Sequence, residues 1–380
     1  MIRIKDKHDC CGCSACFNSC SVGAISMESD ELGFLYPRIN EELCINCGAC
    51  DRACFYATGK EEIENEQESQ VLAIRHKDKD ELKQSRSGAA FIAISNYILD
   101  EGGSVYGARF NEDLVVEHGR AITREERDSF RGSKYVQSDL RGIYKQIIAD
   151  LKVGKDVLFS GTPCQVESIR KYVPKVLQTN LFLVDIICHG TPSPKLFQEH
   201  IKNLEKRERR KIVQFNFRDK SRSGWSGHEE SYVLFTGEKI FAKKFTQLFY
   251  TNAFFRESCY TCPFANMERV GDITLGDFWG WEKVDSHFNE DNKGVSLVLI
   301  NTAKGKSLFN QIKGKVDAII SNKEQCLQRN LVNPTPQPGN RSEIVSYYIK
   351  NGYPRLIWRY FSNSMSSRIY RRLRLLFKLK

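Results

Sequence analysis

The chain has 380 residues, of which 14 are cysteines, and its 57 lysines and arginines outnumber its 47 aspartates and glutamates, giving a formal charge of +10. This length exceeds one ordinary hydrophobic core and predicts a small module followed by one large or two medium domains. The first seven residues contain no apolar signal segment, and no run approaches the ~18 apolar residues of a membrane-spanning helix, so we expect a cytoplasmic protein in a reducing compartment.

Two nearly identical cysteine runs stand 34 positions apart within the first 54 residues. Both have the spacing C-x-x-C-x-x-C-x-x-x-C, which is typical of bacterial dicluster ferredoxins. Three cysteines of each run can surround one cubane, whereas the fourth lies too far along the chain and ligates the other cluster. We therefore predict two 4Fe-4S clusters, one held by Cys10, Cys13, Cys16 and Cys54 and the other by Cys44, Cys47, Cys50 and Cys20.

A zinc or disulfide framework is the alternative interpretation of these runs. Zinc sites usually take two C-x-x-C pairs, so two complete four-cysteine runs favour clusters. Gly12 and Gly48 lie inside the loops, where the lack of a Cβ lets backbone N–H groups approach inorganic sulfur. The pattern departs from the bacterial one at Ser21 and Phe55, where proline usually follows the last cysteine. Cys11 fits neither register and is interpreted as a spare.

The positive net charge does not by itself indicate a nucleic-acid partner. A cubane with four thiolates carries about −2 when oxidised, so three clusters would offset most of the excess. Basic residues are also spread over the chain instead of alternating with aromatic residues on one element. We therefore expect no nucleic acid among the partners.

Polar and acidic residues at 60–70 indicate a linker after the cysteine-rich module. The elements expected beyond it are a strand at 71–75, a helix at 89–99, paired strands at 103–110 and 114–118, and a helix from about 140 to 151. Turns of small residues with cations, at 85–88 and 131–134, precede the two helices. Free N–H groups and the helix dipole favour phosphate there, although an ordinary N-cap is the preferred explanation of residues 85–88 taken alone.

The next segment alternates between strands and helices as an α/β domain does. A strand at 156–160 leads through a turn into a helix that begins at Cys164, and a strand at 181–187 ends at Cys188. Both cysteines are expected at the carboxyl ends of parallel strands, where open α/β sheets bind ligands. A helix N-terminus lowers the pKa of the Cys164 thiol from ~8.5. No P-loop and no G-x-G-x-x-G fingerprint is present, so no standard nucleotide site is predicted.

A second C-x-x-C pair, Cys259 and Cys262, follows a charged helix face at 201–210, a strand at 212–220 and a hairpin at 231–242. Alone this pair is compatible with a redox dithiol, half of a zinc site or half of an iron–sulfur site. Cys164 and Cys188 supply the two missing ligands. Prolines at alternate positions indicate a rigid linker at 331–340.

The motifs SRSGAA, VYGARF, RGSKYVQS, VLFSGTPCQ, DIICHGTPSP, FRDK, SCYTCPFA and DITLGDFWG occur in this order. With them the chain resembles the coenzyme F-420 hydrogenase/dehydrogenase beta-subunit family with an N-terminal dicluster 4Fe-4S ferredoxin-type domain, over about residues 1–330. The resemblance implies an FAD-binding α/β domain with its own iron–sulfur cluster. The family also resembles chlorophyll-pathway reductases, and many bacterial members belong to surface-polysaccharide gene groups. Use of coenzyme F-420 is not implied.

The expected fold is α+β or α/β, with a ferredoxin-like 2×4Fe-4S module followed by a flavin-binding α/β domain that contains a mixed sheet. The expected domains are a dicluster domain at 1–60, a linker at 61–70, a region with flavin phosphate contacts at 71–150, an α/β domain for FAD and the third cluster at 151–330, and a Pro-rich linker with a basic tail at 331–380.

The function implied by the resemblance is an iron–sulfur flavoprotein oxidoreductase that passes electrons between ferredoxin-type clusters, FAD and another redox partner. The residues expected to hold the flavin phosphates are Ser87, Gly88, Arg131, Gly132, Ser133 and Lys134. Those expected near the ring or a third cluster are Thr162, Gln165, His189 and Asp277. His189 is either a proton donor or a residue that hydrogen-bonds the cluster shell. Cys164, Cys188, Cys259 and Cys262 are predicted to hold a third 4Fe-4S cluster, with zinc as the rival.

The expected partners are a redox protein, either a ferredoxin or subunits of a complex, and a small-molecule substrate or a deazaflavin or flavin acceptor. The alternative function is a non-catalytic electron-transfer subunit of a larger redox complex. Residues 368–380 hold six cations, no acids and an apolar stripe. They predict either peripheral contact with an anionic membrane surface or a helix docked on the protein itself.

Overall fold

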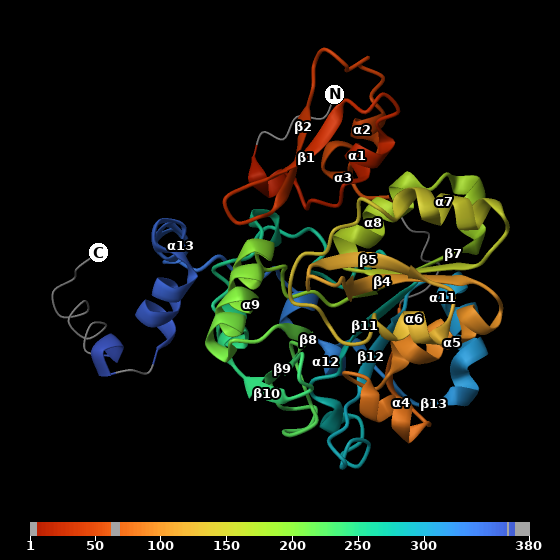
Figure 1. Ribbon diagram of the computed structural model, residues 1–380. Helices are drawn as coiled ribbons and strands as arrows, with labels where there is room; N and C mark the ends of the chain where they lie inside the picture. Colours follow the sequence, from red (N-terminus) through yellow and green to blue (C-terminus); the bar gives the residue numbers. More distant parts are fainter. Residues whose placement is uncertain (1–5, 62–68, 363–364, 369–380) are drawn as a thin grey trace.

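The computed structural model describes residues 6–61, 69–362 and 365–368. The N-terminal module packs its cysteine loops between short helices and one antiparallel hairpin, at the top of Figure 1. Its elements are α1 (Ala15–Ser19), β1 (Ile25–Ser29), β2 (Leu35–Ile39), α2 (Ala49–Arg52) and α3 (Phe55–Thr58). Most of the predicted linker at 61–70 lies outside the described residues.

An eight-stranded mixed sheet forms the centre of the body, with the order β13-β3-β12-β11-β7-β6-β4-β5. The strands β4, β6, β7 and β11 run parallel to one another, and antiparallel strands flank them on both sides. The predicted mixed sheet is therefore confirmed. The bounds are β3 (Gln70–His76), β4 (Ser104–Phe110), β5 (Val116–Ala121), β6 (Val157–Gly161), β7 (Leu181–Ile186), β11 (Ile273–Asp277), β12 (Ser296–Ile300) and β13 (Val316–Ser321).

Helices cover both faces of this sheet (Figure 1). Successive side chains of β6 point to opposite faces of the sheet. Leu158 packs with α5 and α11 on one face, and Val157 and Phe159 pack with α7 and α8 on the other. The N-terminal module lies against the α7–α8 face through residues that include Ala15 and Phe55. The helices of the body up to β13 are α4 (Lys79–Gln84), α5 (Ala90–Asp100), α6 (Arg124–Asp128), α7 (Tyr144–Lys152), α8 (Pro163–Tyr172), α9 (Pro194–Glu208), α10 (Lys244–Phe249) and α11 (Ala303–Ile312).

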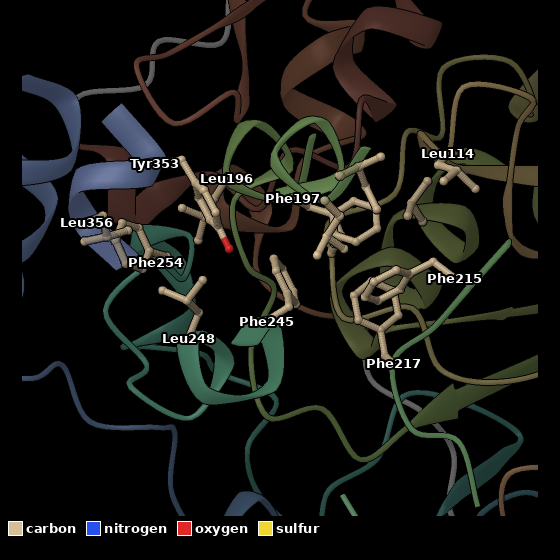
Figure 2. Packing of buried hydrophobic residues seen from close by; sticks show 14 of the residues in the cluster. Leu114, Leu196, Phe197, Phe215, Phe217, Phe245, Leu248, Phe254, Tyr353 and Leu356 are labelled. Atoms are coloured by element: carbon tan, nitrogen blue, oxygen red, sulfur yellow. The ribbon is translucent and has the colours of Figure 1, made fainter. Parts of the chain in front are cut away.

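A second core lies beside the main sheet, where aromatic side chains pack together, as Figure 2 shows. It joins α9 and α10 to the small sheet of β8 (Ile212–Asn216), β9 (Glu230–Leu234) and β10 (Lys239–Ala242). Tyr353 and Leu356 add α13 (Arg341–Leu356) to this core, whereas α12 (Lys323–Cys326) packs through Cys326 against β3 and β12. The predicted hairpin at 231–242 is confirmed as antiparallel β9–β10.

The segment from 331 to 356, expected to be a linker and the start of a tail, packs on the body. Leu331 and Thr335 are buried, and α13 has no counterpart among the predicted elements. Residues 369–380, which carry most of the predicted amphipathic tail, lie outside the described residues. Among the residues that the structure describes, no helix combines the length and apolar character needed to cross a membrane.

Candidate functional site

The first predicted ligand set is assembled at the base of the N-terminal module. Cys10, Cys13, Cys16 and Cys54 together line one small cavity. Burial raises the pKa of the Cys16 thiol, and the neighbouring sulfurs of Cys13, Cys10 and Cys54 raise it further. Four converging thiols that repel one another as thiolates fit a group that neutralises them, as a cubane does.

The second predicted set lies at the outer end of the module. Cys50 is buried and packs with Cys20, whereas Cys47 is exposed. Leu43 and Ile45 flank this loop and are 52% and 63% exposed. All fourteen cysteines of the chain are described, and all are free thiols.

The third predicted set converges beneath the N-terminal module. Cys164 is the second residue of α8, Cys188 follows β7, and Cys259 and Cys262 come from the segment before β11. Burial raises the pKa of the Cys188 thiol, and the Cys259, Cys164 and Cys262 thiolates add to this effect. The four side chains therefore share one low-dielectric neighbourhood, although they come from three segments of the chain.

These thiols are not preassembled around one small ion. A tetrahedral zinc site with Zn–S bonds of about 2.3 Å would bring its sulfurs to about 3.8 Å from one another. Within the described ranges, no three histidine, cysteine, aspartate or glutamate side chains stand close enough to hold a single metal ion.

Cys11, interpreted from the sequence as a spare, lies between the first and third sets. Its side chain interacts with the sulfurs of Cys13 and Cys164, and these contacts together with burial raise the pKa of the Cys11 thiol. Gln137 Nε2 donates to Cys11 O at 2.8 Å, and Tyr144 Oη donates to Cys13 O at 2.8 Å. The body of the protein thus holds the first cysteine loop directly against the third set.

A cavity of about 610 Å³ opens at the carboxyl ends of β4, β6, β7 and β11. This is the edge at which open α/β sheets bind ligands. Cys188 belongs to its wall, so the cavity adjoins the third cysteine set. Ten residues were predicted to hold the flavin phosphates or to lie near the ring or a third cluster. Nine of them line the cavity, namely Ser87, Arg131, Gly132, Ser133, Lys134, Thr162, Gln165, His189 and Asp277.

Lys134 is a cationic side chain of this wall that no carboxylate in the described part of the chain neutralises. Burial lowers the pKa of its ammonium group to about 7. It donates only to the main-chain oxygens of Ser129 and Arg131, at 2.9 Å each, and no carboxylate among the described residues pairs with it. Arg131 differs, because Glu81 at 2.5 Å and Asp128 at 2.7 Å neutralise its guanidinium.

Thr162 and Gln165 shape the start of α8. Gln165 Oε1 accepts from Thr162 N at 3.0 Å in a capping box, and Gln165 Nε2 donates to Ser138 Oγ at 2.9 Å. The Thr162 hydroxyl lies 3.2 Å from the sulfur of Cys164. These two residues therefore fix the position of Cys164 while they line the cavity.

Asp277 organises the aromatic end of the cavity. It accepts hydrogen bonds from Arg218 and, at 3.0 Å, from Trp225 Nε1. Burial alone would raise the pKa of this carboxyl, but the nearby Arg218 and Arg86 guanidiniums outweigh burial and hold it below its usual value. Trp225 stacks on Trp279 with ring centroids 4.5 Å apart. Asp277 is therefore ionised and orients a cationic and aromatic wall.

Both ring nitrogens of His189 face amide side chains. Nδ1 lies 3.1 Å from Asn330 Oδ1, and Nε2 lies 2.9 Å from Asn252 Oδ1. Asn330 uses its amide nitrogen to donate to Thr335, so its oxygen accepts from His189 Nδ1. This arrangement favours one of the two predicted roles of His189, namely that it positions the adjoining Cys188 loop. It disfavours the other role, a free proton donor.

His118 lines the same cavity and was not among the predicted residues. Its Nε2 lies 3.1 Å from Ser160 O, so this nitrogen carries the proton, and its buried Nδ1 has no partner in the described part of the chain. Burial lowers the pKa of His118 to about 4, so the ring is neutral at pH 7. His118 reaches the cavity because β5 pairs with β4, and no sequence motif identifies it as a site residue.

Gly88 itself does not line the cavity, although Ser87 and Ala89 on either side of it do, and its contact with phosphate stays a prediction. A Cβ on Gly88 would stand 2.0 Å from Ile74 O and 2.5 Å from Ser296 N, both backbone atoms of neighbouring strands. The residue is therefore glycine because the loop packs directly on the sheet.

We expect Gly88→Ala to lower the free energy of unfolding by about 1–3 kcal/mol, because two strands must move to admit the methyl group. Urea unfolding measures this loss. Gly142→Ala is the control, since apart from its chain neighbours no atom in the described part of the chain lies within 4 Å of its Cβ position, and it should leave stability nearly unchanged. Equal stabilities for the two variants would contradict the packing role.

Comparison with known proteins identifies two segments of the chain. Residues 9–58 match the 4Fe-4S dicluster domain, and residues 154–324 match the family described as the C terminus of the beta subunit of coenzyme F420 hydrogenase/dehydrogenase. No curated protein matches the chain. A solved structure of the F420-reducing [NiFe] hydrogenase complex from Methanosarcina barkeri, derivatised with xenon, contains a chain with 17% identity and a TM-score of 0.47. That match covers 78% of this chain and 93% of the other.

The structural match is too weak to support a conclusion about activity. The family matches indicate iron–sulfur electron transfer of the oxidoreductase type. Over residues 9–58 and 154–324 the chain is thus similar to 4Fe-4S dicluster domains and to the C-terminal part of coenzyme F420 hydrogenase/dehydrogenase beta subunits, which confirms the resemblance predicted from its motifs.

Proposed function

We propose that the protein is an iron–sulfur flavoprotein oxidoreductase, in which electrons pass between the N-terminal clusters, a third cluster and FAD. The observation that carries this proposal is the continuity of the cysteine sets with the cavity. Cys13, Cys11 and Cys164 are in contact, and Cys188 belongs both to the third set and to the cavity wall. A redox group in the cavity would therefore adjoin the third cluster.

The cavity fits FAD in size and charge. Its volume of about 610 Å³ lies within the usual range for cofactor sites, about 300–1,000 Å³. Its wall holds four cationic side chains, Arg86, Arg131, Lys134 and Arg218, against the single carboxylate of Asp277. Lys134 would hold a phosphate, and His118 Nδ1 would accept a hydrogen bond from a ring N–H. When bound, the flavin supplies exchange of one or two electrons.

Anaerobic purification followed by iron, sulfide and flavin analysis tests the proposal directly. We expect about 12 iron atoms and about one FAD per chain. Turnover is then measured with reduced ferredoxin as donor and a small-molecule acceptor. Absence of flavin from an iron-replete protein that also fails to bind added FAD would overturn the flavin assignment.

The second candidate is a non-catalytic electron-transfer subunit of a larger redox complex. The exposed loop around Cys47, with Leu43 and Ile45 projecting into solvent, favours a protein partner at the outer cluster. If turnover appears only when a partner protein is added, this candidate is correct. The partner classes remain a ferredoxin or complex subunits on one side and a small-molecule, deazaflavin or flavin acceptor on the other.

His118→Phe should weaken FAD binding by about three- to tenfold, because one hydrogen bond of about 1 kcal/mol is lost. Phenylalanine keeps the ring stack on Phe159, whose centroid lies 5.2 Å away. Fluorescence titration with FAD measures the affinity, and His287→Phe, at an exposed site that does not line the cavity, is the control. Unchanged affinity in His118→Phe would remove this residue from the site.

The predicted domain boundaries, the cytoplasmic location and a role in surface-polysaccharide synthesis belong to this proposal as well. The last of these rests on the family resemblance alone. Membrane contact by residues 368–380 stays a prediction, and unchanged flotation with anionic vesicles after deletion of residues 366–380 would contradict it.

A further inference from the structure

Arg256 is a buried cation that joins the N-terminal module to the loop of the third cysteine set. Its residue is 1% exposed, and it precedes Cys259 by three positions. Its backbone N–H donates to Thr191 O at 3.1 Å, and its carbonyl accepts from Cys259 N at 3.0 Å. Its main chain is therefore fixed to the body of the protein.

The guanidinium of Arg256 reaches the first cysteine loop. Nε donates to Cys10 O at 2.6 Å, and Nη2 lies 3.3 Å from the sulfur of Cys10 and 2.9 Å from Leu35 O. Nη1 donates to Gln137 Oε1 at 3.1 Å, and the group lies 4.1 Å from the centroid of the Tyr36 ring. Among the described residues no carboxylate pairs with this charge. The guanidinium instead donates to the sulfur of Cys10, which is a thiolate when it ligates a cluster.

The surroundings of the two cysteine loops can be compared directly, because an arginine lies beside the glycine of each loop. A Cβ on Gly12 would lie 2.6 Å from Arg256 Nη1, and a Cβ on Gly48 would lie 3.2 Å from Arg52 Nη1. One arginine therefore covers the glycine of each loop. Arg52 is exposed, comes from the module itself and donates to Cys47 O at 3.1 Å. Water screens the charge of Arg52, whereas burial leaves the charge of Arg256 largely unscreened.

We propose that Arg256 is a positioning residue that holds the Cys10 loop against the third set and raises the reduction potential of the cluster held by Cys10, Cys13, Cys16 and Cys54. Reduction adds negative charge to a cluster, and a buried cation hydrogen-bonded to a ligand sulfur stabilises the reduced state. The inference rests on the proposed function only for the presence of the N-terminal clusters. It makes this cluster a better electron acceptor than the exposed one.

Redox titration of the anaerobically purified full chain, monitored by EPR, tests the proposal. In Arg256→Met the reduced-to-oxidised ratio of one cluster at a fixed potential should fall at least tenfold, which is about 59 mV for a one-electron couple. Arg52→Met, the matched control, should change the ratio of any cluster by less than twofold. Limited proteolysis between residues 58 and 70 should also become faster in Arg256→Met, because the module is held less firmly.

A second variant keeps the arginine and its packing. Gln137→Glu places a carboxylate on Nη1 of Arg256 and offsets its charge, so the same cluster should again become harder to reduce. Gln137→Leu, which loses the same bond to Cys11 O without adding a charge, is its control and should shift the midpoint less. If Arg256→Met loses its clusters, Gln137→Glu decides the question. Unshifted midpoints with full iron content overturn the role of Arg256 but leave the proposed function intact, whereas a wild-type protein without iron overturns both.

Discussion

The double variant Cys259→Ser/Cys262→Ser is expected to lose about 4 of about 12 iron atoms per chain and to keep the other 8. The reason is that the third set shares no predicted ligand with the two N-terminal sets, although the first and third sets lie side by side. Cys259 and Cys262 share their neighbourhood with Cys164 and Cys188, whereas all ligands predicted for the two N-terminal clusters lie within the first 54 residues. Removal of two ligands should therefore dissolve one cluster and spare two.

The same measurement separates a cluster from zinc. Four thiolates satisfy either group, but a zinc site would give about 8 iron atoms and one zinc in the wild type, and the double variant would then lose zinc alone. Cys326→Ala is the control, because this cysteine is buried against β3 and β12 with Leu331, in a cluster that contains no predicted ligand cysteine. Its iron content should equal that of the wild type. An unchanged iron content in the double variant would disprove the third cluster.

Local signals in the sequence were sufficient to predict the parts of the site that lie at the ends of regular elements. The strand before Cys188 and the helix after Thr162 follow from short apolar runs and turn residues, and parallel pairing then brings both ends to one edge. The turn at 131–134 shows its cations directly in the sequence. These features need no knowledge of distant contacts.

The residues that the sequence did not reveal depend on long-range packing. His118 reaches the cavity only through the register of β5 with β4. Trp225 lies behind the wall, where it stacks on Trp279 and donates to Asp277, 52 positions away. Arg256 lies beside a recognisable C-x-x-C pair, but its partner Cys10 is 246 residues distant. The tight packing of Gly88 could not be predicted either, because the small residues at 85–88 are equally compatible with a phosphate-binding loop and with a loop packed against a sheet.

Lys134→Met should weaken FAD binding by about 10- to 100-fold at pH 6.5, since a charged hydrogen bond of about 1.5–3 kcal/mol is lost. In the free protein, burial lowers the pKa of Lys134 to about 7 from an ordinary value of 10.5. A bound phosphate would raise this pKa again, because the anion stabilises the ammonium form. Above pH 7 binding therefore takes up a proton, and wild-type affinity should fall by up to about tenfold per pH unit.

The lowered pKa of Lys134 also sets the direction in which this residue makes the stability of the protein depend on pH. Between about pH 7 and 10.5 the unfolded chain binds the Lys134 proton and the folded protein does not, so Lys134 contributes a rise in the free energy of unfolding of the flavin-free protein with pH in this window. Lys134→Met should remove this contribution and the proton uptake that accompanies FAD binding. Calorimetry in buffers of different ionisation enthalpy measures the proton uptake.

Lys220 provides the matched control for this prediction. Burial also lowers the pKa of Lys220 to about 7, but its ammonium donates to Leu82 O and Lys293 O and lies outside the cavity wall. Lys220→Met should therefore change the pH dependence of stability and leave the proton uptake on FAD binding unchanged. If Lys134→Met binds FAD as the wild type does, with the same proton uptake, the cavity does not place a phosphate on Lys134.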